Sequence, residues 1–447
     1  MEALENILTQ ISDLLWGYPL IILLFGTHVF LTFRLRIIQR FIGKAIKISL
    51  RRDKEGKGDI SQFGALTTAL AATIGTGNIV GVSTAVAAGG PGAVLWMWLT
   101  GVFGIATKYS EALLSVKYRV KMPDGSMAGG PMYVLERGLN MKWLAVLFAA
   151  FTSVTAFGIG NMVQANSIST LVQEAFQIPM WITGLVLTIL TAVVIIGGIK
   201  SIAKVCERLV PFMAITYVLG CLIVLGMNIQ GIPDTVMLIL NSAFSGHAVV
   251  GGFLGAGMKE AIRFGIARGL FSNESGLGSA PIVAAAAQTK NPVRQALVSS
   301  TGTFWDTVVV CAMTGLVIVN SGEWVKGLSG AALTKQAFSD FHIIGPIVLT
   351  LGLLTFVFST ILGWSYYGEK AAEYLFGNKV VKPYRYLWVM FVMIGSVMSL
   401  NVVWTFADIT NALMAVPNLI SLILLSGIIV KETKKYLWDD KLDEEGE

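Results

Sequence analysis

Two long apolar segments of this chain are interrupted by glycines and small polar residues, and these interruptions limit what the chain can fold into. The first reads Thr73-Ile-Gly-Thr-Gly-Asn-Ile-Val-Gly81, and the second reads Gly269-Leu-Phe-Ser-Asn-Glu-Ser-Gly-Leu-Gly-Ser-Ala-Pro281. Lipid offers the backbone no hydrogen-bond partners, so non-helical chain persists at membrane depth only where protein buries it or where it lines a cavity. The pattern therefore predicts two discontinuous membrane helices, which is typical of transporter binding sites.

The composition places the chain in a membrane. Of its 447 residues, 54% are hydrophobic and only 13% are charged, with a mean hydropathy of +0.70. Soluble domains carry roughly 25% charged residues. The backbone of each span must satisfy its own hydrogen bonds, and long apolar runs do this as helices. We therefore expect an all-α polytopic membrane protein.

Hydropathy predicts about eleven spans of roughly 20 residues each. They lie near residues 15–35, 64–89, 92–118, 143–173, 180–200, 208–228, 248–288, 295–319, 344–374, 385–406 and 408–430. The loop 34–57 is rich in arginine and lysine, which indicates the cytoplasmic side. Alternating spans then predict that the N-terminus lies outside and the C-terminus inside. The net charge of +6 fits basic helix ends that face anionic lipid, so no nucleic-acid partner is expected.

The two breaks also divide the chain into halves. If the first span is set aside, the breaks fall in the first and the sixth of the ten remaining spans. The resulting domains are an extra helix with a basic linker (1–57), a first five-helix repeat (58–228), a second five-helix repeat (229–430) and a cytoplasmic tail (431–447). Because five is odd, the repeats have opposite orientations in the membrane. Asn78 aligns with Asn273, and Glu111 then follows the first asparagine at the interval at which Asp306 follows the second.

A broken helix exposes backbone groups that can bind a zwitterion. Free N–H groups at the start of a half-helix suit a carboxylate, and free carbonyls at the end of its partner suit an ammonium group or Na⁺. The candidate substrate-binding residues are small or polar, with bulky neighbours that would limit the substrate side chain to a methyl group. They are Thr73, Gly75, Thr76, Gly77, Asn78, Gln164, Phe271, Ser272, Asn273, Leu277 and Trp364. Close helix packing would explain the glycines, but not an asparagine at both breaks.

A cation site is expected beside the first break, because hard cations take oxygen ligands. The candidate ligands are the carbonyls of Ala72 and Gly75, the hydroxyls of Ser359 and Thr360, and the carboxylate of Glu274. The two hydroxyls could equally bond back to their own helix. For Glu274, three roles stay open: a cation ligand, a proton relay, and an acid that caps a half-helix.

Several stretches resemble the alanine or glycine:cation symporter family. The first break is followed by Ala88-Gly-Gly-Pro-Gly92 and Trp96-Met-Trp98, and the segment from Gly265 to Pro281 is similar to the family signature. Gly129-Gly-Pro-Met-Tyr133 and Trp364-Ser-Tyr-Tyr-Gly-Glu369 are similar to further family segments. The resemblance covers nearly the whole chain. It implies the leucine-transporter-like fold of two inverted repeats. It also implies uptake of alanine or glycine by alternating access, coupled to Na⁺ or in some members to H⁺, in a prokaryotic plasma membrane.

Three other classes of protein compete with this interpretation. A channel would need a continuous polar path, whereas here the polar residues gather at two matched breaks. A membrane enzyme is not expected, because no span carries a nucleophile–base pair or a set of metal ligands. The glycine spacing of the first break does not match the dinucleotide fingerprint either. Within the transporters, a symporter of another small amino acid, or one driven by protons, is the alternative.

Overall fold

The computed structural model describes the chain except residues 1, 52–55, 245–256, 342, 399–400 and 446–447. Parts of the basic loop (Arg52 and Lys54) and the start of the predicted span 248–288 therefore lie outside the described residues.

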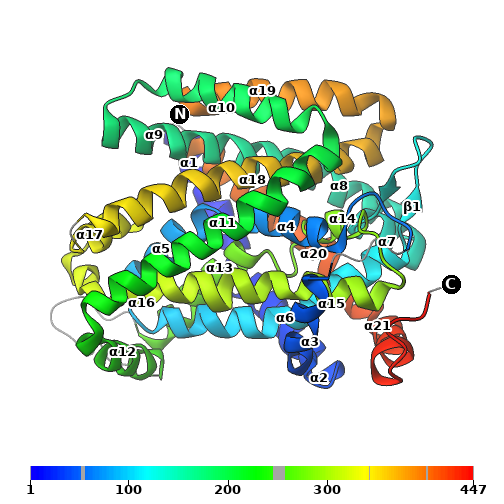
Figure 1. The fold of residues 1–447 in the computed structure, drawn as a ribbon, viewed down its shortest axis with the longest axis horizontal. Helices are drawn as coiled ribbons and strands as arrows, with labels where there is room; N and C mark the ends of the chain where they lie inside the picture. Colours follow the sequence, from blue (N-terminus) through cyan, green and yellow to red (C-terminus); the bar gives the residue numbers. More distant parts are fainter. Residues whose placement is uncertain (1, 52–55, 245–256, 342, 399–400, 446–447) are drawn as a thin grey trace.

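The described residues are almost entirely helical (Figure 1). The α-helices of the first part are α1 (Glu2–Leu15), α2 (Tyr18–Arg34), α3 (Ile42–Ser49), α4 (Gln62–Thr73), α5 (Val82–Gly89), α6 (Ala93–Lys117), α7 (Pro131–Leu139), α8 (Lys142–Phe157), α9 (Val163–Phe176), α10 (Met180–Ile195) and α11 (Gly198–Met227). Those of the second part are α12 (Ile232–Phe244), α13 (Met258–Asn273), α14 (Pro281–Ala284), α15 (Pro292–Thr303), α16 (Ala312–Ser321), α17 (Gly330–Ser339), α18 (Ile344–Phe376), α19 (Val381–Val397), α20 (Asn401–Leu424) and α21 (Ser426–Thr433).

Shorter elements connect these helices. The π-helical segments are η2 (Gly77–Gly81), η3 (Gly158–Met162), η5 (Phe304–Cys311) and η8 (Lys434–Trp438). The 3₁₀ turns are η1 (Ile38–Phe41), η4 (Ile229–Gly231), η6 (Glu323–Lys326) and η7 (Asn378–Val380). Strands β1 (Val120–Lys121) and β2 (Met127–Ala128) pair antiparallel, with Val120 opposite Ala128.

Many of the helices have the length and apolarity of membrane spans. Among the described residues, five continuous stretches qualify: Lys142–Phe176, Gly198–Met227, Pro292–Ser321, Ile344–Phe376 and Thr405–Leu424. Two bent pairs qualify if each counts as one span, namely Tyr18–Arg34 with Ile38–Ser49 and Gln62–Thr73 with Gly77–Gly89. The second pair is the first predicted break, and its two parts meet at a bend of 54°. The predicted number of eleven spans stays a prediction.

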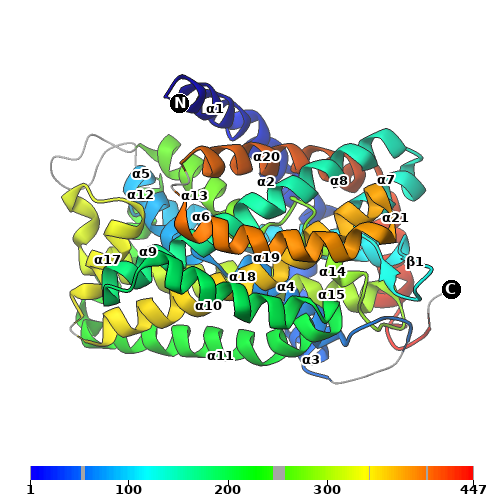
Figure 2. The same cartoon turned by 90° about the horizontal axis from the view of Figure 1, so that it is seen from above.

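The long helices run roughly along one direction. In Figure 1, α11 and α18 cross the view, with α12 and α17 at the left and β1, α7 and the C-terminus at the right. We call the end with β1 and α7 the basic end, because Lys57 of the basic loop forms a β-bridge with Thr289 there. We call the opposite end the distal end. Figure 2 shows that α1 projects from the body of the molecule.

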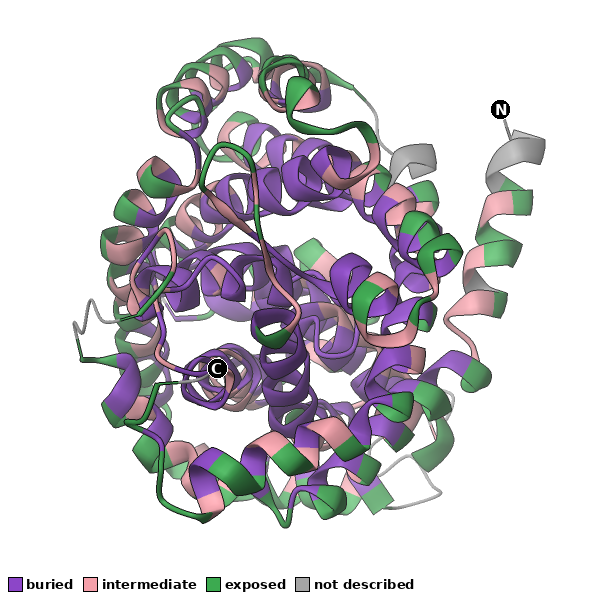
Figure 3. Ribbon diagram, turned by 90° about the vertical axis from the view of Figure 1, so that its right-hand side faces the viewer, coloured by how far each residue is buried: buried purple, intermediate pink, exposed green. Residues whose placement is uncertain are grey.

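Burial is arranged as a bilayer requires. Seen from the basic end, buried residues gather at the centre and exposed ones on the surrounding helices (Figure 3). Helix α10 exposes large apolar side chains such as Trp181, Leu185 and Val193, which are suited to contact with acyl chains. At the centre, α6 packs against α13 and α15, α5 packs against α13, and α18 packs against α4. Both glycine-rich breaks therefore lie in the buried centre.

Candidate functional site

The first break is held open by Asn78. Helix α4 ends at Thr73, and Ile74 adopts an extended conformation (φ −76°, ψ 95°). The backbone N–H of Gly75 then donates to Asn78 Oδ1 at 2.8 Å, in place of a carbonyl one turn earlier. The chain resumes as the π-helical segment η2 at Gly77. The end of α4 and the start of η2 thus meet at membrane depth, as the sequence predicts.

The second break is longer, and its glycines are required by their conformation. Helix α13 ends at Asn273, and Glu274 is left-handed with φ 55°. Gly276 and Gly278 have φ 90° and 86°, a region that glycine enters without the steric cost of a Cβ. The Asn273 Oδ1 atom accepts from the Ser275 N–H at 2.9 Å. The chain stays without a continuous helix until α14 begins at Pro281.

Asp306 joins the two breaks. Its Oδ1 atom accepts from Asn78 Nδ2 at 2.7 Å, and its Oδ2 atom accepts from Ser272 Oγ at 3.0 Å. Thr307 Oγ1 donates to the same Oδ2 atom at 2.7 Å, and Asn273 Nδ2 donates to Thr307 Oγ1 at 3.1 Å. A single buried carboxylate therefore collects donors from the ends of both broken segments.

Glu111 accepts hydrogen bonds from the second break, as Asp306 does from the first. Its Oε1 atom accepts from the N–H groups of Gly276 at 3.0 Å and Gly278 at 3.1 Å, and from Asn418 Nδ2 at 2.7 Å. The two acids that the sequence alignment matches thus act reciprocally. Asp306, from the second half, binds the break of the first half, while Glu111 does the reverse. Both acids are buried, and among the described residues Lys108 donates no hydrogen bond to either.

The two breaks also touch directly. A Cβ built on Gly77 would lie 3.3 Å from Ser272 Cα and 3.4 Å from Phe271 Cδ1, so the backbones approach more closely than larger residues allow. Gln164, predicted from the fourth span, donates to Thr76 Oγ1 at 3.4 Å and to the Ile159 carbonyl at 2.9 Å. It therefore lies beside the first break.

Trp364 lies beside the second break, and its neighbours include a feature that the sequence analysis missed. Its Nε1 atom donates to Glu274 Oε1 at 3.0 Å, and Ser279 Oγ donates to Glu274 Oε2. Gly160, in η3, packs so closely that a Cβ there would lie 2.3 Å from Trp364 Cβ. The signal was present in the glycines of Gly158-Ile-Gly160 inside the fourth predicted span.

The predicted cation ligands come together only in part. Ser359 Oγ donates to the Ala71 carbonyl at 3.1 Å, and Thr360 Oγ1 donates to the Ile74 carbonyl at 3.4 Å. Both hydroxyls also bond back to the Phe356 carbonyl, at 2.8 Å and 2.9 Å. Each hydroxyl thus bonds back to its own helix, which is one of the two alternatives that the sequence left open, and it also faces a carbonyl of the first break. The carbonyls that face these hydroxyls belong to the residues just before Ala72 and Gly75.

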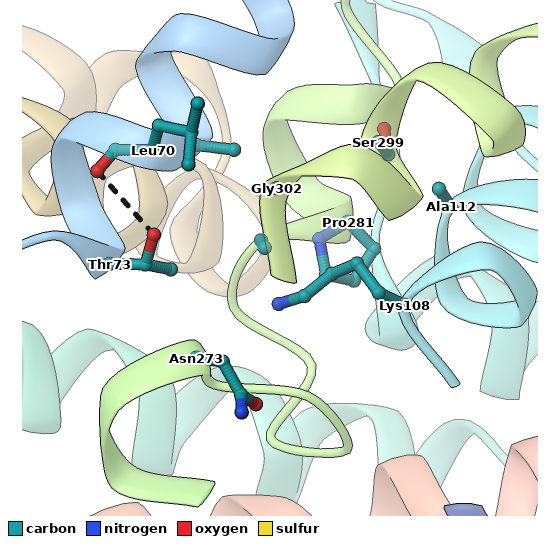
Figure 4. Close-up of a pocket in the computed structure, with 10 residues that line it drawn as sticks. Leu70, Thr73, Lys108, Ala112, Asn273, Pro281, Ser299 and Gly302 are labelled. Atoms are coloured by element: carbon teal, nitrogen blue, oxygen red, sulfur yellow. Dashed lines mark hydrogen bonds between the residues drawn. The ribbon is translucent and has the colours of Figure 1, made fainter. Parts of the chain in front are cut away.

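The remaining predicted residues lie in four places. Gly75 faces Thr360, and Ala72 packs against Gly363, so both lie at the contact between α4 and α18. Glu274 does not join them, since its carboxylate is bound by Ser279 and Trp364. Leu277 is fully buried in the hydrophobic core. Thr73 and Asn273 line a small cavity together with Lys108 (Figure 4).

At the basic end, hydrogen bonds tie several segments of the chain together. Arg119 donates to the carbonyls of Lys57, Ala285 and Ala287 at 2.9, 3.0 and 2.8 Å. Ile60 pairs with Ala287 in a parallel bridge, which ties the entry to α4 to the exit from the second break. Nearby, Asp59 accepts from the Met127 N–H at 2.8 Å, and partial burial raises the pKa of its carboxyl group.

At the distal end, a cavity reaches the second break. This cavity of about 100 Å³ is lined by Trp16, Arg263, Arg268, Phe271 and Asp408. Arg263 and Arg268 precede the second break in α13, and both line this cavity. Phe271 belongs both to this cavity and to the contact with Gly77, so it lies between the cavity and the first break.

A model of the sodium:alanine symporter family matches residues 1–447. The chain belongs to the sodium:alanine symporter family. It is 53% identical over 439 residues to an uncharacterized transporter of Haemophilus influenzae, covering 97% of this chain and 96% of that protein. It is 50% identical over 442 residues to the sodium/alanine symporter AgcS of Methanococcus maripaludis, with 96% and 97% covered.

The fold is shared with a more distant transporter. A crystal structure of the manganese transporter of Eremococcus coleocola aligns with a TM-score of 0.51 and 13% identity, covering 88% of this chain and 85% of that one. The predicted family and the predicted all-α membrane fold are therefore confirmed. The protein is a multi-pass membrane symporter of amino acids, and Na⁺ is its coupling ion.

Proposed function

We propose that this symporter takes up alanine or glycine together with Na⁺, and that the two breaks form the substrate site. The observation that carries the proposal is the junction at Asp306, where Asn78 and Ser272 bring the ends of both breaks to one carboxylate. The name of the family and of the relative AgcS support alanine as the substrate.

The backbone at the junction has the polarity that a zwitterion needs. The start of η2 at Gly77 offers N–H groups and a positive partial charge to a carboxylate. The end of α13, with the carbonyls of Gly269 to Ser272, offers acceptors to an ammonium group. An amino acid can thus bind between the breaks without a direct ion pair to arginine or lysine.

Bulky side chains around the junction support a small substrate. Phe271 lies against Gly77, and Trp364 is fixed in place by its hydrogen bond to Glu274 and by Gly160 behind it. We propose that both rings wall the substrate site and limit the substrate side chain to about a methyl group. This supports alanine and glycine over larger amino acids.

We propose that Na⁺ binds where α18 meets the end of α4. Ser359 and Thr360 already direct their hydroxyls at the carbonyls of Ala71 and Ile74, and hard cations prefer such oxygen atoms. An ion there would hold α18 against the first break. Because the first break also forms half of the substrate site, binding of the ion favours binding of the substrate, and the reverse follows by linkage.

The reciprocal acids support the inverted repeats, residues 58–228 and 229–430. A two-fold relation between the halves accounts for Asp306 binding Asn78 while Glu111 binds Gly276. The positive-inside rule assigns the basic end to the cytoplasm, which leaves the N-terminus outside and the C-terminus inside. The hydrogen bonds of Arg119 to the carbonyls of Lys57, Ala285 and Ala287 then form the cytoplasmic gate. Alternating access requires these bonds to break.

The test is uptake of labelled alanine into proteoliposomes with an inward Na⁺ gradient, an equal K⁺ gradient or an inward proton gradient. Accumulation with Na⁺ alone supports the proposal. Accumulation only with the proton gradient would favour Glu274 as a proton carrier, and no accumulation would mean a different substrate. Counterflow of labelled alanine tests the channel alternative, since a channel shows none.

A further inference from the structure

Lys108 is a buried lysine whose ammonium group has no hydrogen-bond partner in the described part of the chain. It lies nine residues before the end of α6 at Lys117, which corresponds to about 14 Å along the helix. Its exposed fraction is 4%, and its Nζ atom has no hydrogen-bond partner among the described residues. The other buried lysine of the described chain, Lys370, bonds Glu373 at 2.7 Å. Unpaired charges in this environment are costly and are usually functional.

The Lys108 side chain points between the two breaks. In Figure 4 it extends into the space between Thr73, at the end of α4, and Asn273, at the end of α13. The cavity there has a volume of about 10 Å³, which is room for about one water-sized particle. Three buried acids lie at the breaks or bind them, namely Glu111, Glu274 and Asp306.

A partner for Lys108 is available one turn along its own helix. Glu111 follows it at the i,i+3 position, a spacing at which helical side chains meet. The Oε1 atom of Glu111 takes all the bonds to the second break, while its Oε2 atom has no partner among the described residues. Two buried and oppositely charged groups on one helix thus each have an unsatisfied atom.

We propose that Lys108 is a tethered cation that competes with the coupling Na⁺ for the negative charge at the breaks. With Na⁺ absent, the ammonium group occupies the cavity between Thr73 and Asn273 and balances the carboxylates. With Na⁺ bound, the ammonium group is repelled and pairs with Glu111 Oε2. This exchange favours release of Na⁺ and keeps the emptied site electrostatically balanced. The inference rests on the proposed function, in which Na⁺ binds near these breaks.

The test measures equilibrium binding of radioactive Na⁺ to the purified protein, and the Na⁺ dependence of alanine uptake in proteoliposomes. Lys108→Met removes the competing charge, so the half-saturating Na⁺ concentration falls about fivefold or more, the lower range of couplings between sites. The maximal uptake rate falls as well, because Na⁺ leaves more slowly. If the methionine variant does not fold, Lys108→Gln replaces it with the same expectation.

Glu111→Gln is expected to change the half-saturating Na⁺ concentration in the opposite direction. Glutamine keeps a carbonyl oxygen for Gly276 and Gly278 but cannot draw the ammonium group away, so the half-saturating Na⁺ concentration rises. In the double variant with Lys108→Met, the effect of Glu111→Gln disappears. Lys117→Met is the matched control, because Lys117 is on the same helix but pairs at the surface with Glu432 at 2.7 Å. It leaves Na⁺ binding unchanged.

Unchanged or weaker Na⁺ binding by Lys108→Met would overturn the inference, as would tighter binding by Glu111→Gln. A general structural role for Lys108 would weaken binding in both variants rather than shift it in opposite directions. If the wild-type protein neither binds Na⁺ nor takes up alanine with it, the proposed function fails first. The two failures are therefore distinguishable.

Discussion

Replacing Gly75 by alanine tests the contact between the first break and α18. A Cβ on Gly75 would lie 2.6 Å from Thr360 Oγ1, and 3.6 and 3.7 Å from its Cβ and Cγ2 atoms. Thr360 cannot easily turn away, because its hydroxyl bonds the carbonyls of Phe356 at 2.9 Å and Ile74 at 3.4 Å. Helix α18 must therefore move, or the hydroxyl must abandon the end of α4.

The expected change in Na⁺ affinity follows from the steric overlap between the added Cβ atom and Thr360. Forcing an extra methyl group into a packed site costs about 1–3 kcal/mol. If that cost falls on the Na⁺-bound form, the half-saturating Na⁺ concentration rises about 5-fold to 150-fold, since roughly 1.4 kcal/mol corresponds to a factor of ten. Membrane insertion and the yield of folded protein should stay near wild type, because the strain is confined to one contact.

The measurement is the Na⁺ dependence of labelled alanine uptake in proteoliposomes. Gly81→Ala is the matched control, since it lies at the end of the same break but a Cβ there meets nothing within 4 Å. We expect wild-type Na⁺ dependence for this control. Wild-type Na⁺ dependence in Gly75→Ala as well would refute the assignment of the ion to the contact between α4 and α18.

Three further substitutions test the substrate site and the driving ion. Asn78→Ala removes the bonds to Gly75 and Asp306, so alanine affinity in equilibrium binding should fall at least tenfold, given about 1.5–3 kcal/mol for a bond to a charged group; unchanged affinity would move the site elsewhere. Trp364→Ala enlarges the pocket, so valine and leucine should compete with alanine uptake, and a lack of competition would contradict the proposed size limit. Glu274→Gln should keep Na⁺-dependent uptake, whereas loss of all gradient-driven uptake with intact substrate binding would favour a proton relay.

Much of the architecture was predictable because its signals are local. A run of apolar residues specifies a span, and glycines with small polar residues specify a break, so α4, η2 and α13 could be located from short windows of sequence. The alignment of Asn78 with Asn273 also pointed to Asp306 and Glu111. The pairing between halves was not predicted, because Asn78 and Asp306 are 228 residues apart.

The sequence by itself thus determined a membrane-embedded helical transporter, the positions of its two breaks and the residue types that surround them. Only the tertiary structure decided which groups meet. In the structure, Glu274 bonds Trp364 rather than Ser359 and Thr360, and Gly160 packs behind that ring. Lys108 lies between the breaks without a hydrogen-bond partner among the described residues. The physical reason is that hydropathy and backbone freedom act within one helix, whereas hydrogen-bond partners depend on the rotation and register of helices that pack from distant parts of the chain.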